Sequence, residues 1–213
     1  MLYDISPVID ERLAVWPGDT PVRREVILER ARGDTVDLSA LTATVHLGAH
    51  TDAPSHYGTN AATMEARSLE LYLGRCQVVR GPVGRNRRIL PENLSTPIRA
   101  ERVLFATGTY PDPTVFNEDF AALSPELIDW LHAEGVRLVG IDTPSIDLFH
   151  SKDLPAHNAC LRHDMAVLEG LVLNRVPEGV YELMALPLRL AGFDASPVRA
   201  VLRTHEGRKH SEE

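Results

Sequence analysis

The chain has 213 residues, of which 44% are hydrophobic and 24% are charged, and its formal net charge is −8. These values are typical of one globular domain, and the negative charge argues against nucleic acid or an anionic membrane surface as a partner. The N-terminus lacks a signal-peptide pattern and no apolar run approaches the roughly 20 residues that span a bilayer, so we expect a cytoplasmic protein.

Short apolar runs bounded by turn residues predict several β-strands. Residues 41–47 alternate apolar and polar side chains with the period of a half-buried strand, which would place His46 on the face opposite the core. Four further runs are rich in β-branched or apolar residues and end at glycine, aspartate or arginine. Buried strands are therefore expected at 76–81, 102–108, 136–142 and 197–203.

Two helices are expected among these strands. Ser124 is suited to the N-cap, Pro125 to the first helical position and Gly135 to the C-terminal cap of a helix over 124–135. A second helix is expected within 154–165. Helices that alternate with strands are typical of a single mixed α/β domain, which we place at 1–205 with a polar tail at 206–213.

The most informative segment is HLGAHTDAPSH, residues 46–56, because it holds three histidines and one aspartate: His46, His50, Asp52 and His56. Gly48 and Pro54 make a helix improbable here, so we expect a strand entering a tight turn at which the first three of these side chains meet. Two neutral imidazoles and a carboxylate suit zinc, manganese or iron and leave coordination positions open for water or substrate. The alternative is a set of polar turn residues with ordinary hydrogen bonds.

This segment resembles the signature His-x-Gly-Thr-His-x-Asp-x-Pro-x-His of the cyclase-like metal-dependent hydrolases, with Ala49 where threonine is common. The stretches YDISPVID, WPGDTP, TGTYPDP, VGIDTPSID and HNACLRHDMAVLEGL extend the resemblance over most of the chain. It is strongest to the bacterial arylformamidases, or kynurenine formamidases, of that family. The resemblance implies a swivelling β/β/α fold, a homodimer with its sites near the interface, and hydrolysis of N-formyl-L-kynurenine to L-kynurenine and formate.

The resemblance also implies a ligand set for two divalent metal ions. His46, His50 and Asp52 would bind the first ion, and Asp52 would bridge to a second ion held by His157 and Glu169. We expect Zn²⁺, with Mn²⁺ or Co²⁺ as alternatives. Two such ions would lower the pKa of a shared water and polarise the formamide carbonyl. The residues alone make His157 a candidate ligand but do not single out Glu169; the alternative is that His157 is a helix-surface residue and Glu169 a strand-end charge.

Two further residues are candidates for direct roles in catalysis or binding. His56 is not needed as a ligand, so it could act as general base toward the water and then as general acid to the departing arylamine. The alternative is a structural hydrogen-bond donor. Trp16, in a Pro-Gly turn, could stack on the aryl ring of the substrate, with packing in the core or an interface as the alternative.

Other chemically active residues are expected to lie outside the site. We predict that Asp142 and Asp147 cap turns around Pro144 and Ser145. Buried structural thiols are expected at Cys76 and Cys160. Three histidines are left out of the proposed ligand set: His132, His150 and His163.

Different functions remain open at this point. The chain has no GxSxG motif, which argues against a serine hydrolase. A related metal enzyme that opens a cyclic amide such as isatin would share the same metal motif. A non-catalytic metal-binding module would be expected to close its coordination with four protein ligands and would have no use for His56.

Overall fold

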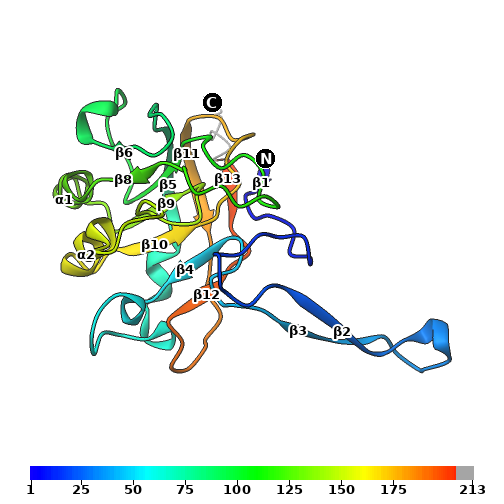
Figure 1. Ribbon diagram of the computed structural model, residues 1–213. Coiled ribbons are helices and arrows are strands. Elements are labelled where there is room, and N and C mark those ends of the chain that lie inside the picture. The colour runs from blue at the N-terminus through cyan, green and yellow to red at the C-terminus, as the bar shows by residue number, and fades with distance from the viewer. Residues whose placement is uncertain (205–213) are drawn as a thin grey trace, which may run out of the picture.

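The computed structural model describes residues 1–204, so the tail expected at 206–213 lies outside the described residues. The centre is a curled, nine-stranded mixed sheet (Figure 1). Its strand order is β1 (Leu2–Asp4), β13 (Val201–Thr204), β11 (Gly179–Met184), β5 (Leu73–Arg80), β7 (Arg102–Ala106), β9 (Leu138–Ile141), β10 (Ala166–Glu169), β4 (His50–Asp52) and β12 (Ala195–Pro197). This architecture confirms the predicted single mixed α/β domain.

The middle of the sheet is parallel and its two sides are antiparallel. Strands β5, β7, β9 and β10 run parallel to one another, and all residues of β7, β9 and β10 are buried. Burial on both faces explains why these strands read as continuous apolar runs. The strands predicted at 76–81, 102–108 and 136–142 are confirmed and correspond to β5, β7 and β9.

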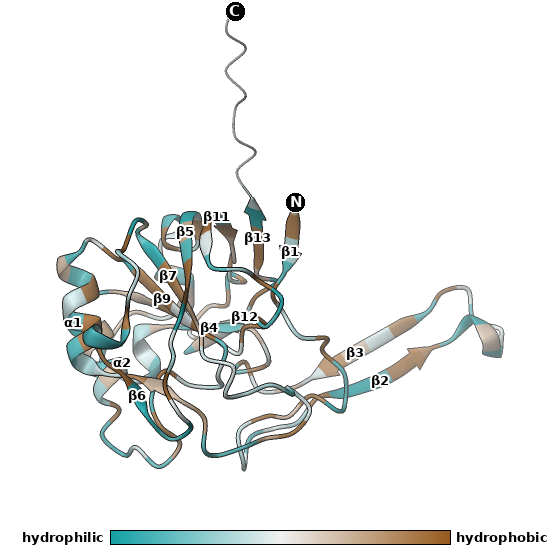
Figure 2. Ribbon diagram, turned by 90° about the horizontal axis from the view of Figure 1, so that it is seen from above, coloured by the Kyte–Doolittle hydropathy of each residue, from teal (hydrophilic) through white to brown (hydrophobic). Residues whose placement is uncertain are grey.

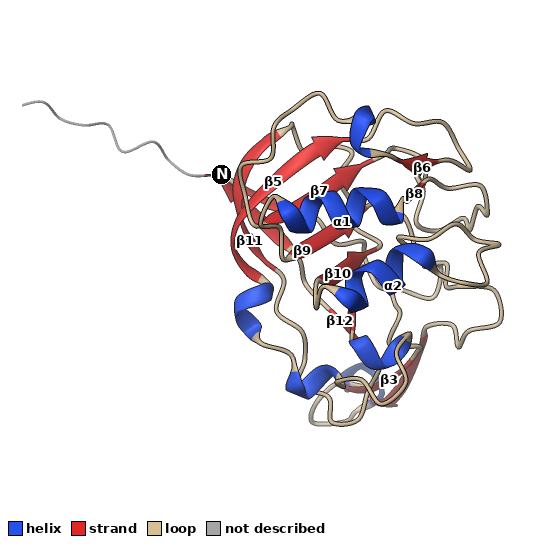
Figure 3. Ribbon diagram, turned by 90° about the vertical axis from the view of Figure 1, so that its left-hand side faces the viewer, coloured by secondary structure: helices blue, strands red, loops and turns tan. Residues whose placement is uncertain are grey.

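Two α-helices cover one face of the sheet (Figure 3). Helix α1 (Pro125–Ala133) begins after Ser124, whose hydroxyl accepts a hydrogen bond from the backbone N–H of Leu127, as the sequence predicts. Helix α2 (Pro155–Arg162) confirms the helix expected within 154–165. Buried side chains of both helices pack on strands β7, β9 and β10: Leu127, Ile128, Leu131, Ala156, Ala159 and Cys160. A second apolar cluster, which includes Ile5, Leu171 and Leu173, covers the opposite face.

The remaining elements are short. Strands β6 (Arg88–Ile89) and β8 (Ala122–Leu123) form a parallel pair beside α1. Single turns of 3-10 helix occur at Arg30–Arg32, Pro54–His56, Met64–Ala66, Leu69–Leu71 and Pro91–Asn93.

A long antiparallel hairpin, formed by β2 (Arg23–Leu28) and β3 (Leu38–Thr42), projects away from the sheet (Figures 1 and 2). The prediction of a half-buried strand over 41–47 is wrong, because β3 ends at Thr42 and residues 43–47 are irregular. An alternating pattern predicts burial only where one strand face meets a core, and Leu41 on this hairpin is 63% exposed.

The prediction of a single strand at 197–203 is also wrong. The chain instead makes β12 and β13, separated by residues 198–200. Strand β12 pairs with β4, whereas β13 pairs with β1 and β11 at the other side of the sheet. The chain must therefore leave one ladder before it can join the other, although its apolar pattern continues without a break.

Candidate metal centre

The centre of the site is the short strand β4, which carries two of the predicted ligands. His50 and Asp52 are two residues apart, so their side chains project from the same face of the strand. In the antiparallel pairing with β10, His50 lies directly opposite Glu169. The sheet register therefore brings Glu169 to the opening motif across about 120 residues of sequence.

The turn before β4 brings His46 to the same place. Gly48 adopts a left-handed conformation with φ of 53°, as expected for the tight turn. The ring centroids of His46 and His50 are then 5.2 Å apart. His157 enters from the first turn of α2, and its ring is buried. The structure thus brings all five predicted ligands together.

Ligand-type atoms converge on the two oxygens of Asp52. Its Oδ1 lies 3.1 Å from His46 Nδ1 and 3.5 Å from His50 Nε2. Its Oδ2 lies 3.4 Å from His157 Nε2, which is also 3.3 Å from Glu169 Oε1. Because each oxygen faces a different group of side chains, the carboxylate has the arrangement of a bridging ligand.

The hydrogen bonds on the outer side of each ring assign the tautomers. His46 Nε2 lies 2.9 Å from Asp194 Oδ2, His50 Nδ1 lies 2.9 Å from the Gly48 carbonyl, and His157 Nδ1 lies 2.8 Å from Asp147 Oδ2. Each of these partners is an acceptor, so each outer nitrogen donates. In the neutral imidazoles the inner nitrogens then carry lone pairs that face the carboxylates.

Lone pairs that face carboxylate oxygens in a buried site repel them unless a proton or a metal ion lies between. His50 Nε2 and both oxygens of Asp52 are buried and have no hydrogen-bond partner among the described residues. Within 1–204, two clusters of ligand-type atoms have the spacing of a metal site, namely His46–Asp52–His56 and His50–Asp52–Glu169. The donor set of imidazole and carboxylate fits the divalent ions expected from the sequence.

The charges of the site favour the same conclusion. Burial disfavours the charged form of His46, but the negative charges of Asp52 and Asp194 and the hydrogen bond to Asp194 outweigh it and raise the pKa of His46 to about 9. Burial likewise opposes protonation of His157, but Asp147, Asp52 and Glu169 raise its pKa well above the usual value. Without metal, protons would therefore occupy the places that cations fill in a loaded site.

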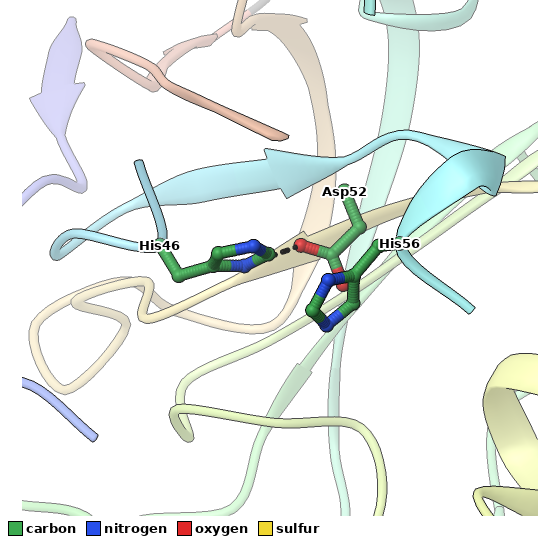
Figure 4. Close-up of side chains that lie close together, drawn as sticks. All are labelled: His46, Asp52 and His56. Carbon is green, nitrogen blue, oxygen red and sulfur yellow. Dashed lines mark ion pairs between the residues drawn. The ribbon is translucent and has the colours of Figure 1, made fainter. Parts of the chain in front are cut away.

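His56 lies beside His46 and Asp52 (Figure 4), and it is the most exposed of these three side chains. It ends the 3-10 turn Pro54–His56, and its ring centroid is 4.2 Å from that of His46. Its Nδ1 lies 3.2 Å from Asp194 Oδ2, and its side chain is 36% exposed. Its position is compatible with proton exchange with solvent, although its proximity to His46 and Asp52 also leaves a ligand role open.

A cavity of about 680 Å³ opens over the cluster. His46, His50, His56, His157 and Glu169 line one part of it. Trp16 lines another part, with its ring 4.9 Å from that of Phe149 and 5.5 Å from that of Phe116. The predicted substrate-binding residue therefore belongs to an aromatic wall of the same cavity.

Two carboxylates at the site were missed by sequence reasoning. Asp147 was expected to cap a turn near Ser145. This prediction is wrong, because its carboxylate caps the start of α2 instead. Its carboxylate accepts hydrogen bonds from the backbone N–H groups of Ala156 and His157, from His157 Nδ1 and from Arg88. The only local signal was its position eight residues before α2, which says nothing about the His157 ring.

Asp194 was not singled out at all, because no metal or turn signal surrounds it in the sequence. In the structure the backbone N–H of Ala53 donates to its carbonyl, and its carboxylate contacts both His46 and His56. Asp142 behaves as a turn-capping residue, but of the turn at 107–109: it accepts from the N–H groups of Thr107 and Gly108.

The histidines and cysteines expected to lie outside the site do so. His163 contacts Asp129 and stacks on His132, and His150 is exposed on the surface near Glu118. Cys76 and Cys160 are free and fully buried, as expected of structural thiols.

Comparison with known proteins decides the family. Residues 3–148, about two thirds of the chain, match the family described as putative cyclase, and this segment contains the whole opening motif. The chain belongs to the putative cyclase family.

Solved structures with the same cyclase-family fold agree over nearly the whole chain. One described as a potential metal-dependent hydrolase with cyclase activity is 29% identical, with a TM-score of 0.82 over 95% of this chain and 96% of that one. A predicted metal-dependent hydrolase from Bacillus stearothermophilus is also 29% identical, with a TM-score of 0.79 over 95% and 97% of the two chains. Isatin hydrolase A from Labrenzia aggregata shares the fold at 23% identity and a TM-score of 0.81, over 97% of this chain and 94% of that one.

No helix within 1–204 is long and apolar enough to cross a membrane.

Proposed function

We propose that this cyclase-family protein is a metal-dependent arylformamidase that hydrolyses N-formyl-L-kynurenine to L-kynurenine and formate. One observation carries the proposal: three histidines, each fixed from behind by an acceptor, direct their free nitrogens at two buried carboxylates on the floor of a large cavity. The two solved structures at 29% identity, both described as metal-dependent hydrolases, support the same reaction class.

In this proposal, His46, His50 and Asp52 would hold one divalent ion, and Asp52, His157 and Glu169 would hold the other. Divalent ions bound there supply a water of lowered pKa and a Lewis acid for the carbonyl oxygen. Asp52 and Glu169 are buried, and their negative charges would offset part of the positive charge of the ions.

His56 moves the protons. Its Nδ1 donates to Asp194, which leaves Nε2 as the nitrogen that takes a proton from the attacking water and returns it to the arylamine. The amine is a poor leaving group without that proton, so an acid at this position contributes directly to bond cleavage.

The aromatic wall supports an aryl substrate. The cavity of about 680 Å³ is within the usual range of small-molecule sites. Trp16 lines the cavity and packs against Phe116 and Phe149, so an aromatic ring is available there without the entropic cost of ordering a flexible side chain. Stacking of the aryl ring there would place the formamide toward the metal ligands.

The test uses purified protein in metal-free and Zn²⁺-loaded forms. We expect loaded protein to release formate and L-kynurenine from N-formyl-L-kynurenine, and metal-free protein to lose this activity. Hydrolysis of isatin in preference to the formamide would favour the cyclic-amide enzyme instead. Bound zinc without hydrolysis of either compound would favour the non-catalytic metal module.

We also propose that the protein forms a homodimer through the β2–β3 hairpin. A two-stranded hairpin is marginally stable alone, yet this one exposes apolar side chains: Val26, Ile27, Val36, Leu38 and Leu41. The segment 23–42 contains four arginines and four acidic residues, so a second copy meets no net repulsion there. The adjoining residues Thr44 and Val45 line the cavity, which places the hairpin beside the site.

Light scattering tests the dimer. We expect a mass of twice 23.6 kDa for the wild type and a shift toward monomer for Leu41→Glu. Val115→Glu, which changes an equally exposed apolar residue outside the hairpin, is the control. A monomeric wild type at micromolar concentration, or a dimer unaffected by Leu41→Glu, would contradict the proposal.

A further inference from the structure

Asp194 occupies an unusual position between two functional histidines. It precedes β12, in which Ala195 pairs directly with the predicted bridging ligand Asp52. The Asp194 carbonyl accepts a 2.8 Å hydrogen bond from Ala53 N–H, so the backbone on both sides of Asp52 is tied to this segment. The position of the Asp194 side chain is therefore determined by the same sheet that positions the ligands.

A single oxygen of this carboxylate serves both rings. Asp194 Oδ2 lies 2.9 Å from His46 Nε2 and 3.2 Å from His56 Nδ1. Both nitrogens must donate to it, which has a different consequence for each ring. His46 is held with its Nδ1 lone pair toward Asp52, whereas His56 is left with Nε2 as its proton-accepting atom.

A second carboxylate–histidine pair in the same chain, Asp147 and His157, differs from this arrangement in its burial and in the number of its partners. Asp147 is fully buried and is satisfied by the start of α2 and by Arg88 as well as by His157. Asp194 is 46% exposed at the cavity, and within residues 1–204 its carboxylate hydrogen-bonds His46 and His56. The Asp194 carboxylate is therefore open to water at the cavity, whereas the Asp147 carboxylate is enclosed by protein.

We propose that Asp194 is a positioning residue that joins the metal centre to the acid–base histidine. It holds His46 in its metal-facing tautomer and His56 in its proton-transferring orientation through one shared oxygen. When His56 takes a proton, the adjacent carboxylate stabilises the imidazolium, as the aspartate does in a Ser-His-Asp triad. The kinetic part of this inference rests on the proposed hydrolysis, whereas the metal-binding part does not.

The main variant is Asp194→Ala, which removes both hydrogen bonds at a half-exposed position where the fold should tolerate it. We expect Zn²⁺ affinity, measured by competition with a chelator, to fall roughly 10- to 100-fold, as is typical when the hydrogen-bond partner of a ligand histidine is lost. At saturating Zn²⁺ we expect kcat to remain reduced by about 10-fold or more while KM changes little, because proton transfer is affected and not substrate binding.

Asp129→Ala is the matched control. Its carboxylate also hydrogen-bonds a histidine, His163, but on the surface far from the cavity. We expect wild-type Zn²⁺ affinity and kcat for this variant. A melting curve for each protein establishes that all variants are folded.

A double-mutant cycle tests whether Asp194 acts through His56. At saturating Zn²⁺, Asp194→Ala should lower kcat much less in a His56→Ala background than in the wild type, because the group that it positions is already absent. Equal losses in both backgrounds would overturn this part of the inference. Unchanged Zn²⁺ affinity in folded Asp194→Ala would overturn the His46 part.

These failures differ from failure of the proposed function. Zinc-loaded wild-type protein that does not hydrolyse N-formyl-L-kynurenine would refute the arylformamidase assignment. The chelator competition would still decide whether Asp194 supports the His46 ligand.

Discussion

Replacement of Asp147 by asparagine should damage both the fold and metal binding. The buried carboxylate accepts four hydrogen bonds, from Arg88, from the N–H groups of Ala156 and His157, and from His157 Nδ1 at 2.8 Å. An asparagine of the same shape keeps one acceptor oxygen, but its NH2 group must face at least one of these donors. Two donors then oppose each other in a dry site, and the Arg88 charge loses its counter-ion.

The magnitude follows from these contacts. Breaking a buried ion pair typically lowers the free energy of unfolding by about 3–5 kcal/mol. Because Arg88 is partly exposed and asparagine retains some hydrogen bonds, we expect a loss at the lower end, about 3 kcal/mol. For a protein of this size that corresponds to a fall in Tm of roughly 6–12 °C. Since His157 loses the partner that sets its tautomer, Zn²⁺ affinity should also fall roughly 10- to 100-fold.

The assay combines thermal melting of metal-free protein with chelator competition for Zn²⁺. Asp129→Asn is the control, because it weakens a solvent-exposed contact to Arg162 and His163, and it should change Tm by no more than a few degrees. If Asp147→Asn matches the wild type in both measurements, the assignment of His157 Nε2 as the inward-facing lone pair is incorrect.

Three further predictions address the site. His50→Ala should lose metal and activity together, whereas His56→Ala should retain its metals while its kcat falls roughly 10²- to 10⁴-fold. The metal content of both variants is measured by elemental analysis. Loss of metal from His56→Ala would show that His56 is a ligand. Glu169→Gln should drop the stoichiometry from two metals per chain toward one, and a fully active wild type with a single metal would contradict the dinuclear proposal. In metal-free protein, the raised pKa of His46 stabilises the fold by about 3 kcal/mol below pH 6.5, and this contribution is lost as pH rises through about 9. Urea unfolding should show that loss between these pH values in the wild type but not in His46→Gln, and an identical pH dependence in both proteins would exclude this role for His46.

Local sequence was sufficient for the elements whose signals are themselves local. The N-cap at Ser124 and the proline that follows it determine the start of α1, and continuous apolar runs identify the buried parallel strands. The opening motif predicts its turn, since Gly48 permits it, but the strand that carries His50 and Asp52 on one face was not predicted and is seen only in the structure. The resemblance to a family then supplied His157 and Glu169 from distant sequence.

Only the tertiary structure decided which groups surround those residues. Glu169 meets His50 because of a sheet register, and Asp194 reaches His46 and His56 because β12 pairs with β4. Such pairings are long-range contacts, and nothing in the residues near Asp147 or Asp194 specifies them. The hairpin is an example in which the local pattern misleads. The alternating pattern near Leu41 predicts a half-buried strand, but it identifies only the apolar face of a strand and not the part of the protein that would bury it. Whether an amphipathic face meets a core, solvent or a second chain depends on packing that local sequence does not contain.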